Sequence, residues 1–369
     1  MEQNLKKNMK ETKKRNISID ILKITSMIMV IILHTKTYGL KGISFEPTQA
    51  IYWIVWTLYF FSLVAVNCFV LISGYFMSAR DSLFLPKKTF KLWLLAEIIS
   101  IGIYLVMCSI PNSNVDFSFG QLILNALPIM SNQYWFFTCY FVLMVIAPFL
   151  NRFINTLEQK DFKKCLLIIL SLFVFIPSIN IFGDNFDSSK GYSAIWFIVL
   201  YLVASYLRRY PLPKKPYGIL YIAISITSVF AHTLLNTLGN YLPLFTQASD
   251  ILLRYNCITT FTASVCLFLF FLNHPIKTKK FLEKLVTQIA TASFTVYLIH
   301  EHPSLRITLW NTIIKLNETT ESIPNYLLRL IIVIAAIFVS GITVGKILSI
   351  LIDTGEKLLY KIRNDKTRY

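Results

Sequence analysis

Nine ionisable side chains lie inside or at the ends of long apolar runs. In a lipid environment each such group costs a few kcal/mol, so each is by default a candidate for function. Imidazole titrates near neutral pH and is well suited to take a proton from a hydroxyl group. The nine residues are Asp20, Lys23, His34, Glu97, His232, Arg254, His300, Glu301 and Arg329.

The apolar run that begins near residue 17 carries three of these groups. The step of eleven residues from Lys23 to His34 turns an α-helix by about 1100°, within about 20° of a whole number of turns. Both side chains therefore share one face, about 16 Å apart along the axis, and Asp20 lies one turn before Lys23, where the two can pair. Two interpretations stay open: an interfacial ion pair and a satisfied histidine, or a functional stripe.

His300 and Glu301 lie near the end of a later apolar run. Adjacent helical residues point about 100° apart, so we expect only one of them to face a narrow interior site. We favour Glu301, because a carboxylate facing lipid is the worse outcome. A pair between Glu301 and His34 is one possibility, and a Glu301 already in headgroup water is the other. Ser73-Gly74 favours close helix packing or a helix break over a nucleophile.

Positioning these groups requires membrane-spanning helices. The chain of 369 residues is 55% hydrophobic and 15% charged, with a mean hydropathy of +0.58, whereas soluble domains are about 25% charged. A span needs about 20 mostly apolar residues, because a helix satisfies its own backbone hydrogen bonds in lipid. The sequence predicts an all-α, polytopic integral membrane protein with about ten spans and an interfacial helix at 118–131. The ten runs are 17–38, 51–77, 90–108, 134–150, 165–182, 192–207, 217–236, 251–272, 287–302 and 325–350.

Lysine and arginine are distributed unequally between the two sets of connecting segments. Both tails and alternate loops hold 27 of them, whereas the remaining loops hold five. Because positive charge resists translocation, both termini are predicted to be cytoplasmic. We expect a basic N-terminal tail over residues 1–16, a ten-helix transmembrane domain over 17–350 and a basic C-terminal tail over 351–369. No small-residue cleavage site follows the first run, so the first span should stay attached.

The net charge of +17 does not indicate a nucleic-acid partner, because the basic residues form short clusters between apolar runs rather than one basic face. Six cysteines are scattered through the chain without CxxC or zinc-ligand spacing, and we expect no metal site.

Four segments carry motifs that occur in a fixed order. In the first, Lys23 is followed by ten residues and then His34. Residues 67–75 end in Ser-Gly-Tyr, residues 134–148 begin with Tyr-Trp-Phe, and residues 293–301 contain Tyr-Leu-Ile-His. In this order, the segments resemble membrane acyltransferase family 3, over essentially the whole predicted membrane region.

Members of that family take an acyl group, usually acetyl, from cytoplasmic acyl-CoA and place it on a hydroxyl of a cell-surface or lipid-linked glycan. The resemblance implies that His34 acts as general base or transient acyl carrier and that Glu301 assists it. It implies that Lys23 stabilises donor phosphate or the thioester oxygen, with Asp20 orienting it. The other residues implied to bind substrate are Ser73, Tyr75, Lys87, Lys88, Lys91, Trp135 and His300.

Lysine stands where the family usually has arginine, at Lys23 and in the segment from Lys88 to Lys91. The positive charge is kept and the planar guanidinium fork is lost. Lys87 joins this segment on the predicted cytoplasmic side, where the phosphates of CoA would arrive, although these lysines can also serve topology alone. The implied setting is a bacterial plasma membrane, with membrane lipid and a glycan acceptor as partners.

A transporter or flippase of a lipid-linked sugar is the main alternative. Transporters tend to show internal repeats and paired helices interrupted by Gly or Pro, and we find no repeat between the halves of this chain. A non-catalytic protein with the family fold is a further alternative, and an acyl-transfer assay separates these interpretations.

Overall fold

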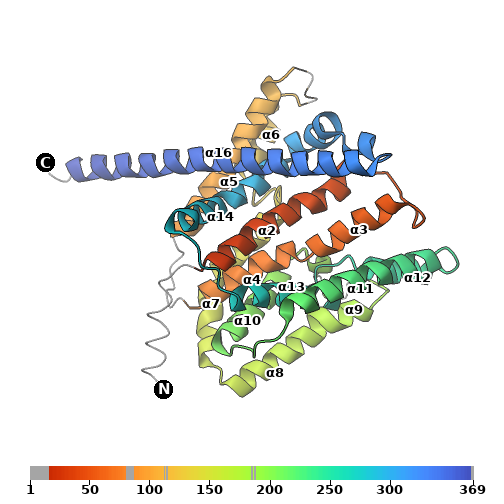
Figure 1. The fold of residues 1–369 in the computed structure, drawn as a ribbon. Helices are drawn as coiled ribbons and strands as arrows, with labels where there is room; N and C mark the ends of the chain where they lie inside the picture. Colours follow the sequence, from red (N-terminus) through yellow and green to blue (C-terminus); the bar gives the residue numbers. More distant parts are fainter. Residues whose placement is uncertain are drawn as a thin grey trace.

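The computed structural model describes the backbone of residues 16–79, 87–111, 113, 115–183, 186 and 188–366, and the side chains of these residues except 87–88 and 356–366. The described part is helical throughout and contains no strand. Figure 1 shows the helices gathered around α2, with α16 running along one side of the bundle. The main helices are α2 (Ile17–His34), α3 (Ala50–Ser62), α4 (Ala65–Met77), α5 (Lys87–Ser109), α6 (Phe119–Ala126), α7 (Trp135–Thr156), α8 (Gln159–Leu170), α9 (Ile176–Ile179), α10 (Ala194–Arg209), α11 (Tyr217–Leu238), α12 (Pro243–Ile251), α13 (Ile258–Asn273), α14 (Lys280–His300), α15 (Pro303–Ile307) and α16 (Ile323–Lys366).

Among the described residues, seven helical segments are long and apolar enough to cross a membrane. The other three predicted spans also form helices, but α10 and α13 have 16 residues each and α14 begins with charged side chains. The expectation of a polytopic helical membrane protein is thus confirmed, whereas the count of ten and the sidedness of the termini stay predictions. The seven segments are Ile17–Gly39, Ala50–Met77, Thr89–Ser109, Trp135–Thr156, Gln159–Ile179, Tyr217–Leu238 and Ile323–Gly355.

Several predicted boundaries are wrong. The run at 251–272 begins in a non-helical turn, and its helix α13 starts only at Ile258. The interfacial helix at 118–131 is the shorter α6, which ends at Ala126. Helix α16 continues to Lys366, past the end of the last predicted apolar run at residue 350. Hydropathy falls gradually along this segment, and the helix continues through good helix formers such as Glu, Lys and Leu.

Helix α2 lies between α14 and α16 on one side and α3 and α4 on the other (Figure 1). Leu22 and Ile31 are fully buried at opposite ends of α2, because the helix is apolar around most of its circumference. Its last turn is therefore held inside the bundle, next to the end of α14.

Small residues set the distances between the neighbouring helices. A Cβ atom on Gly74 of α4 would lie 2.9 Å from the Cβ of Ala204 and 3.0 Å from the Cα of Tyr201, both on α10. The sequence left close packing and a helix break open at Ser73-Gly74, and the structure shows close packing within a continuous helix. Gly341 makes an equally close approach from α16 to Val296 of α14. The first contact holds α4 against α10, and the second holds α16 against α14.

Candidate active site

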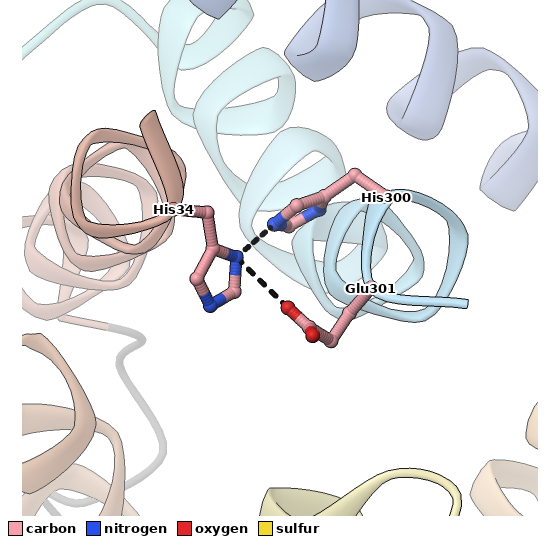
Figure 2. Close-up of side chains that lie close together, drawn as sticks. All are labelled: His34, His300 and Glu301. Carbon is pink, nitrogen blue, oxygen red and sulfur yellow. Dashed lines mark hydrogen bonds and ion pairs between the residues drawn. The ribbon is translucent and has the colours of Figure 1, made fainter. Parts of the chain in front are cut away.

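The end of α2 meets the end of α14 through His34. The Nδ1 atom of His34 lies 2.9 Å from Nε2 of His300 and 3.0 Å from Oε2 of Glu301, as Figure 2 shows. His300 and Glu301 are 1% and 4% exposed. The three side chains form one buried cluster, which we call the histidine–glutamate cluster.

The hydrogen-bond partners determine which nitrogen atoms carry protons. Nδ1 of His300 contacts the backbone carbonyl of Val296, and a carbonyl oxygen can only accept, so this nitrogen carries the hydrogen. Nε2 of a neutral His300 is then an acceptor, which makes Nδ1 of His34 the donor in the contact between them. A neutral His34 therefore keeps its lone pair on Nε2, the nitrogen that points away from both partners in Figure 2.

Each of the two carboxylate oxygens of Glu301 has a different neighbour. Oε1 accepts hydrogen bonds from the hydroxyl of Tyr38 at 2.8 Å and from Nη1 of Arg306 at 2.6 Å. Oε2 lies beside His34 without a completed hydrogen bond. The carboxylate is thus held by two donors on one side and leaves its other oxygen next to the imidazole. A positive charge that forms on His34 would be stabilised there by a nearby negative charge.

Local sequence explains why these side chains converge. After His34 the helix widens into a π-helical turn over Thr35–Gly39, a feature frequent at functional sites, and this turn brings the ring of Tyr38 to 5.3 Å from that of His34. Pro303 disfavours a helical conformation at His302, which is extended, so α14 ends beside Glu301.

The expectation that only one of His300 and Glu301 faces the interior is wrong. Both side chains contact the same nitrogen of His34, because His34 projects into the angle between them. Divergence by about 100° at the helix surface does not stop two long side chains from reaching one atom between them.

His34 lines a partly open cavity of about 100 Å³. Aromatic side chains from several helices form most of its wall, including Trp135 of α7, whose ring lies 4.5 Å from that of Tyr192. The cavity is suited to a small, partly apolar group placed beside an imidazole. Its lining comprises Met27, Val30, Leu33, His34, Thr37, Tyr38, Tyr59, Val66, Phe69, Trp135, Phe136, Tyr192, Tyr255, Phe294 and Tyr297.

Lys23 and Asp20 form the ion pair that their spacing predicts, with Nζ of Lys23 3.8 Å from Oδ1 of Asp20. Asp20 is buried and also accepts a hydrogen bond from Thr287 of α14 at 3.2 Å. Neither residue lines the cavity that contains His34. The shared helical face therefore carries two separate sites, one at each end of α2.

Among the other predicted substrate-binding residues, Trp135 lines the cavity and His300 contacts His34. The remaining ones do not line the cavity or have side chains that are not described. Ser73 is hydrogen-bonded to the hydroxyl of Tyr140 at 2.9 Å. The ring of Tyr75 stacks under the guanidinium of Arg208 at 5.1 Å. Nζ of Lys91 lies 2.8 Å from Oδ1 of Asp353 of α16, and the side chains of Lys87 and Lys88 are not among those described.

Sequence reasoning missed Tyr38 and Arg306, the two donors to Glu301. Arg306 was counted only as a charge in a connecting loop, and its guanidinium also lies 4.7 Å from the ring of Tyr38. Tyr38 follows His34 by one turn, and that spacing alone could have marked it as a neighbour. Nothing in the sequence indicates the contact of Arg306, because it depends on how α14 ends.

The same cluster has the composition of a metal site. His34, His300 and Glu301 each offer one ligand atom, all within 4.8 Å of one another, and two histidines with one glutamate can bind Zn²⁺. The hydrogen bonds described above already account for Nδ1 of His34 and for both nitrogens of His300. The sequence-based expectation of no metal stays a prediction.

The acyltransferase domain of family 3 matches residues 16–345 of the chain. No curated protein and no solved structure matches it. The match extends from the start of α2 to near the middle of α16 and includes every residue of the histidine–glutamate cluster. With its apolar helices and this match over most of its length, the chain belongs to the membrane acyltransferases of family 3.

Proposed function

We propose that this protein transfers an acyl group, acetyl in the simplest case, from cytoplasmic acyl-CoA to a hydroxyl of a cell-surface or lipid-linked glycan, in the plasma membrane of a bacterium. The observation that carries the proposal is the arrangement around His34. Its Nδ1–H is engaged by His300, its Nε2 is left with a lone pair, and the side chain lines a cavity of about 100 Å³.

In the proposed step, Nε2 of His34 takes the proton of the acceptor hydroxyl as its oxygen bonds to the carbonyl carbon of the thioester. The carbon–sulfur bond then breaks, and the thiolate of CoA leaves with the proton that His34 has held. An ester and free CoA are the products, and no oxidant or reductant is needed. Glu301 Oε2, 3.0 Å from His34 Nδ1, stabilises the imidazolium while it exists. If His34 is instead a transient acyl carrier, Nε2 is the atom that bears the acyl group.

The size of the cavity supports binding of the two ends of one acyl-CoA molecule at two different places on the protein. About 100 Å³ accommodates the acyl end of the thioester and not the nucleotide end of CoA. The phosphates would be bound by four lysines. These are Lys23 at the other end of α2 and, on α5, Lys87, Lys88 and Lys91. Lys23 is 32% exposed, so a phosphate can reach its ammonium beside Asp20.

The phosphate-binding role is tested by Lys88→Ala combined with Lys91→Ala. We expect the apparent affinity for acetyl-CoA to fall, because two charges that attract the donor are lost. The orientation of the helices in the membrane should not change, because the basic residues Arg80 and Lys87 remain in this predicted loop. Unchanged affinity for acetyl-CoA in a correctly inserted protein would end the assignment.

The experiment that tests the proposed function uses the purified full chain in lipid vesicles with labelled acetyl-CoA and a bacterial glycan. Label should appear in the glycan as an alkali-sensitive ester. Movement of glycan across the membrane without transfer of label would instead favour the flippase alternative, which the family match does not favour. Mass spectrometry of surface polysaccharide from cells with and without the gene identifies the acyl group and the hydroxyl that it modifies.

A further inference from the structure

The start of α7 borders the cavity with backbone donors that no side chain caps. The helix begins at Trp135, and the preceding residue, Tyr134, makes no side-chain cap hydrogen bond. The first N–H groups of any helix lack a carbonyl partner within the helix, and this end carries a partial positive charge. Trp135 and Phe136, the first two helical residues, both line the cavity.

Tyr297 of α14 adds an independent observation at the same place. Its side chain is 5% exposed and lines the cavity, and its buried hydroxyl lies next to the backbone N–H of Phe136 without a completed hydrogen bond among the described residues. Its ring packs between those of Tyr134 and Phe136, at 6.0 Å and 5.7 Å. A buried, unpaired hydroxyl costs about 1–3 kcal/mol, so its position on the cavity wall indicates a partner that comes with the substrate.

We propose that the Tyr297 hydroxyl and the first N–H groups of α7 form the site that binds the carbonyl oxygen of the acyl group during transfer. This inference rests on the proposed function. As the acceptor oxygen bonds to the carbonyl carbon, the carbonyl electron pair moves onto its oxygen, and the Tyr297 O–H donates a hydrogen bond to the resulting oxyanion. When the carbon–sulfur bond breaks, that pair re-forms the carbonyl, and Tyr297 keeps its proton throughout.

The neighbouring charges are compatible with an oxyanion in the cavity. Glu301 is the carboxylate next to His34, and its negative charge is offset by Arg306 at 2.6 Å. The hydroxyl of Tyr38 is already donated to Glu301, whereas the hydroxyl of Tyr297, beside the backbone N–H of Phe136, donates no hydrogen bond to the described residues. His34 and Tyr297 come from different helices and share a cavity of about 100 Å³, which brings the base and the oxyanion donors to one small acyl group.

The test is Tyr297→Phe in the full-length protein in vesicles, with acetyl-CoA as donor. The substitution removes one oxygen atom and keeps the ring contacts. Loss of a single oxyanion donor lowers kcat by about 10²–10³-fold, and kcat/KM should fall equally because the bond strengthens only in the transition state. The melting temperature should stay the same or rise, because an unpaired buried hydroxyl is removed.

Tyr134→Phe is the matched control. Tyr134 is fully buried, and its hydroxyl lies near the side chain of Ser100 without a completed hydrogen bond. Its ring lies 6.0 Å from that of Tyr297, and it does not line the cavity. We expect this variant to retain wild-type kcat. Replacement of Tyr297 by 3-fluorotyrosine keeps a donor and should retain activity, which separates the hydroxyl from the packing of the ring.

The outcomes distinguish the two proposals. An active wild type with Tyr297→Phe within about threefold of its kcat would overturn the oxyanion site and leave the proposed function standing. Equal losses in Tyr297→Phe and Tyr134→Phe would also overturn it, because they would reflect packing at the start of α7. A folded wild type that transfers no acyl group to any glycan would overturn the proposed function, and this inference with it.

Discussion

The two ends of α2 each pair a basic residue with a carboxylate, and the two pairs differ in almost every physical respect. Lys23 and Asp20 are one turn apart, 3.8 Å between charged atoms, with the lysine 32% exposed. His34 and Glu301 come from helices far apart in the sequence, are 3.0 Å apart, and are 16% and 5% exposed. The first pair follows from local spacing, whereas the second exists only in the folded bundle.

This difference fits the proposed roles of the two ends of α2. The ammonium of Lys23 is partly exposed and within reach of a ligand phosphate, whereas the carboxylate of its partner Asp20 is buried. A buried imidazole between a histidine and a carboxylate is held in one orientation and one protonation pattern. The Lys23 end is suited to binding and the His34 end to proton transfer.

The largest effect that sharpens this contrast is expected for His34→Ala. Transfer should fall by about 10²–10⁴-fold, the usual contribution of a general base, while membrane insertion persists. Lys23→Ala is the comparison, and it should act mainly on KM for acyl-CoA. Residual activity of His34→Ala above about a tenth of wild type would argue against a base at this position.

Glu301→Gln should have the next largest effect. It keeps the shape of the side chain and the bond to Tyr38, and it removes the charge that stabilises an imidazolium on His34. We expect kcat to fall by at least about tenfold, because charges about 4 Å apart interact by a few kcal/mol near a protein surface. Glu283→Gln, at the other end of α14, is the control and should behave as wild type in the same assay.

Gly74→Ala should affect stability more than chemistry. The added methyl would meet Ala204 and the backbone of Tyr201 at about the 2.9–3.0 Å measured from the structure, and such overpacking costs about 1–3 kcal/mol. Gly102→Ala is the matched control, since a Cβ there meets nothing within 4 Å. Thermal unfolding in detergent should show a lower melting temperature for Gly74→Ala alone, and equal melting temperatures would refute the packing argument.

The smallest effect is expected from metal chelation. The nitrogens of His34 and His300 that face one another already share a hydrogen, and Glu301 Oε1 is paired with Arg306, so dialysis against EDTA should leave transfer unchanged. Loss of activity that returns when Zn²⁺ is added would assign the cluster to metal binding instead.

Much of the architecture was predictable from hydropathy, because lipid restricts a spanning segment to a helix. All ten apolar runs coincide with a helix for most of their length. Helix ends were less predictable. Helix α13 starts at Ile258 and helix α16 extends to Lys366. These ends depend on packing and on local turns, which cannot be predicted from hydropathy alone.

The sequence predicted His34, His300 and Glu301 and left their mutual contacts open, and it did not predict Tyr38 or Arg306. The spacing of Asp20 and Lys23 sufficed for their ion pair, since both lie on one helix. The contact of His34 with Glu301 joins residues 34 and 301, and Arg306 reaches Glu301 only because Pro303 ends α14 in the right place. Such contacts depend on how the helices are placed relative to one another, and this cannot be predicted from the spacing of residues within one helix.

Proton transfer by His34 requires an unprotonated Nε2, because Nδ1 is engaged by His300. Solid-state ¹⁵N NMR of histidine-labelled protein in lipid tests it directly, because the chain has only five histidines and a spectrum of His34→Gln assigns the missing signals. At neutral pH we predict a neutral His34 with its proton on Nδ1 and a bare Nε2. A proton on Nε2, or on both nitrogens, would contradict the account.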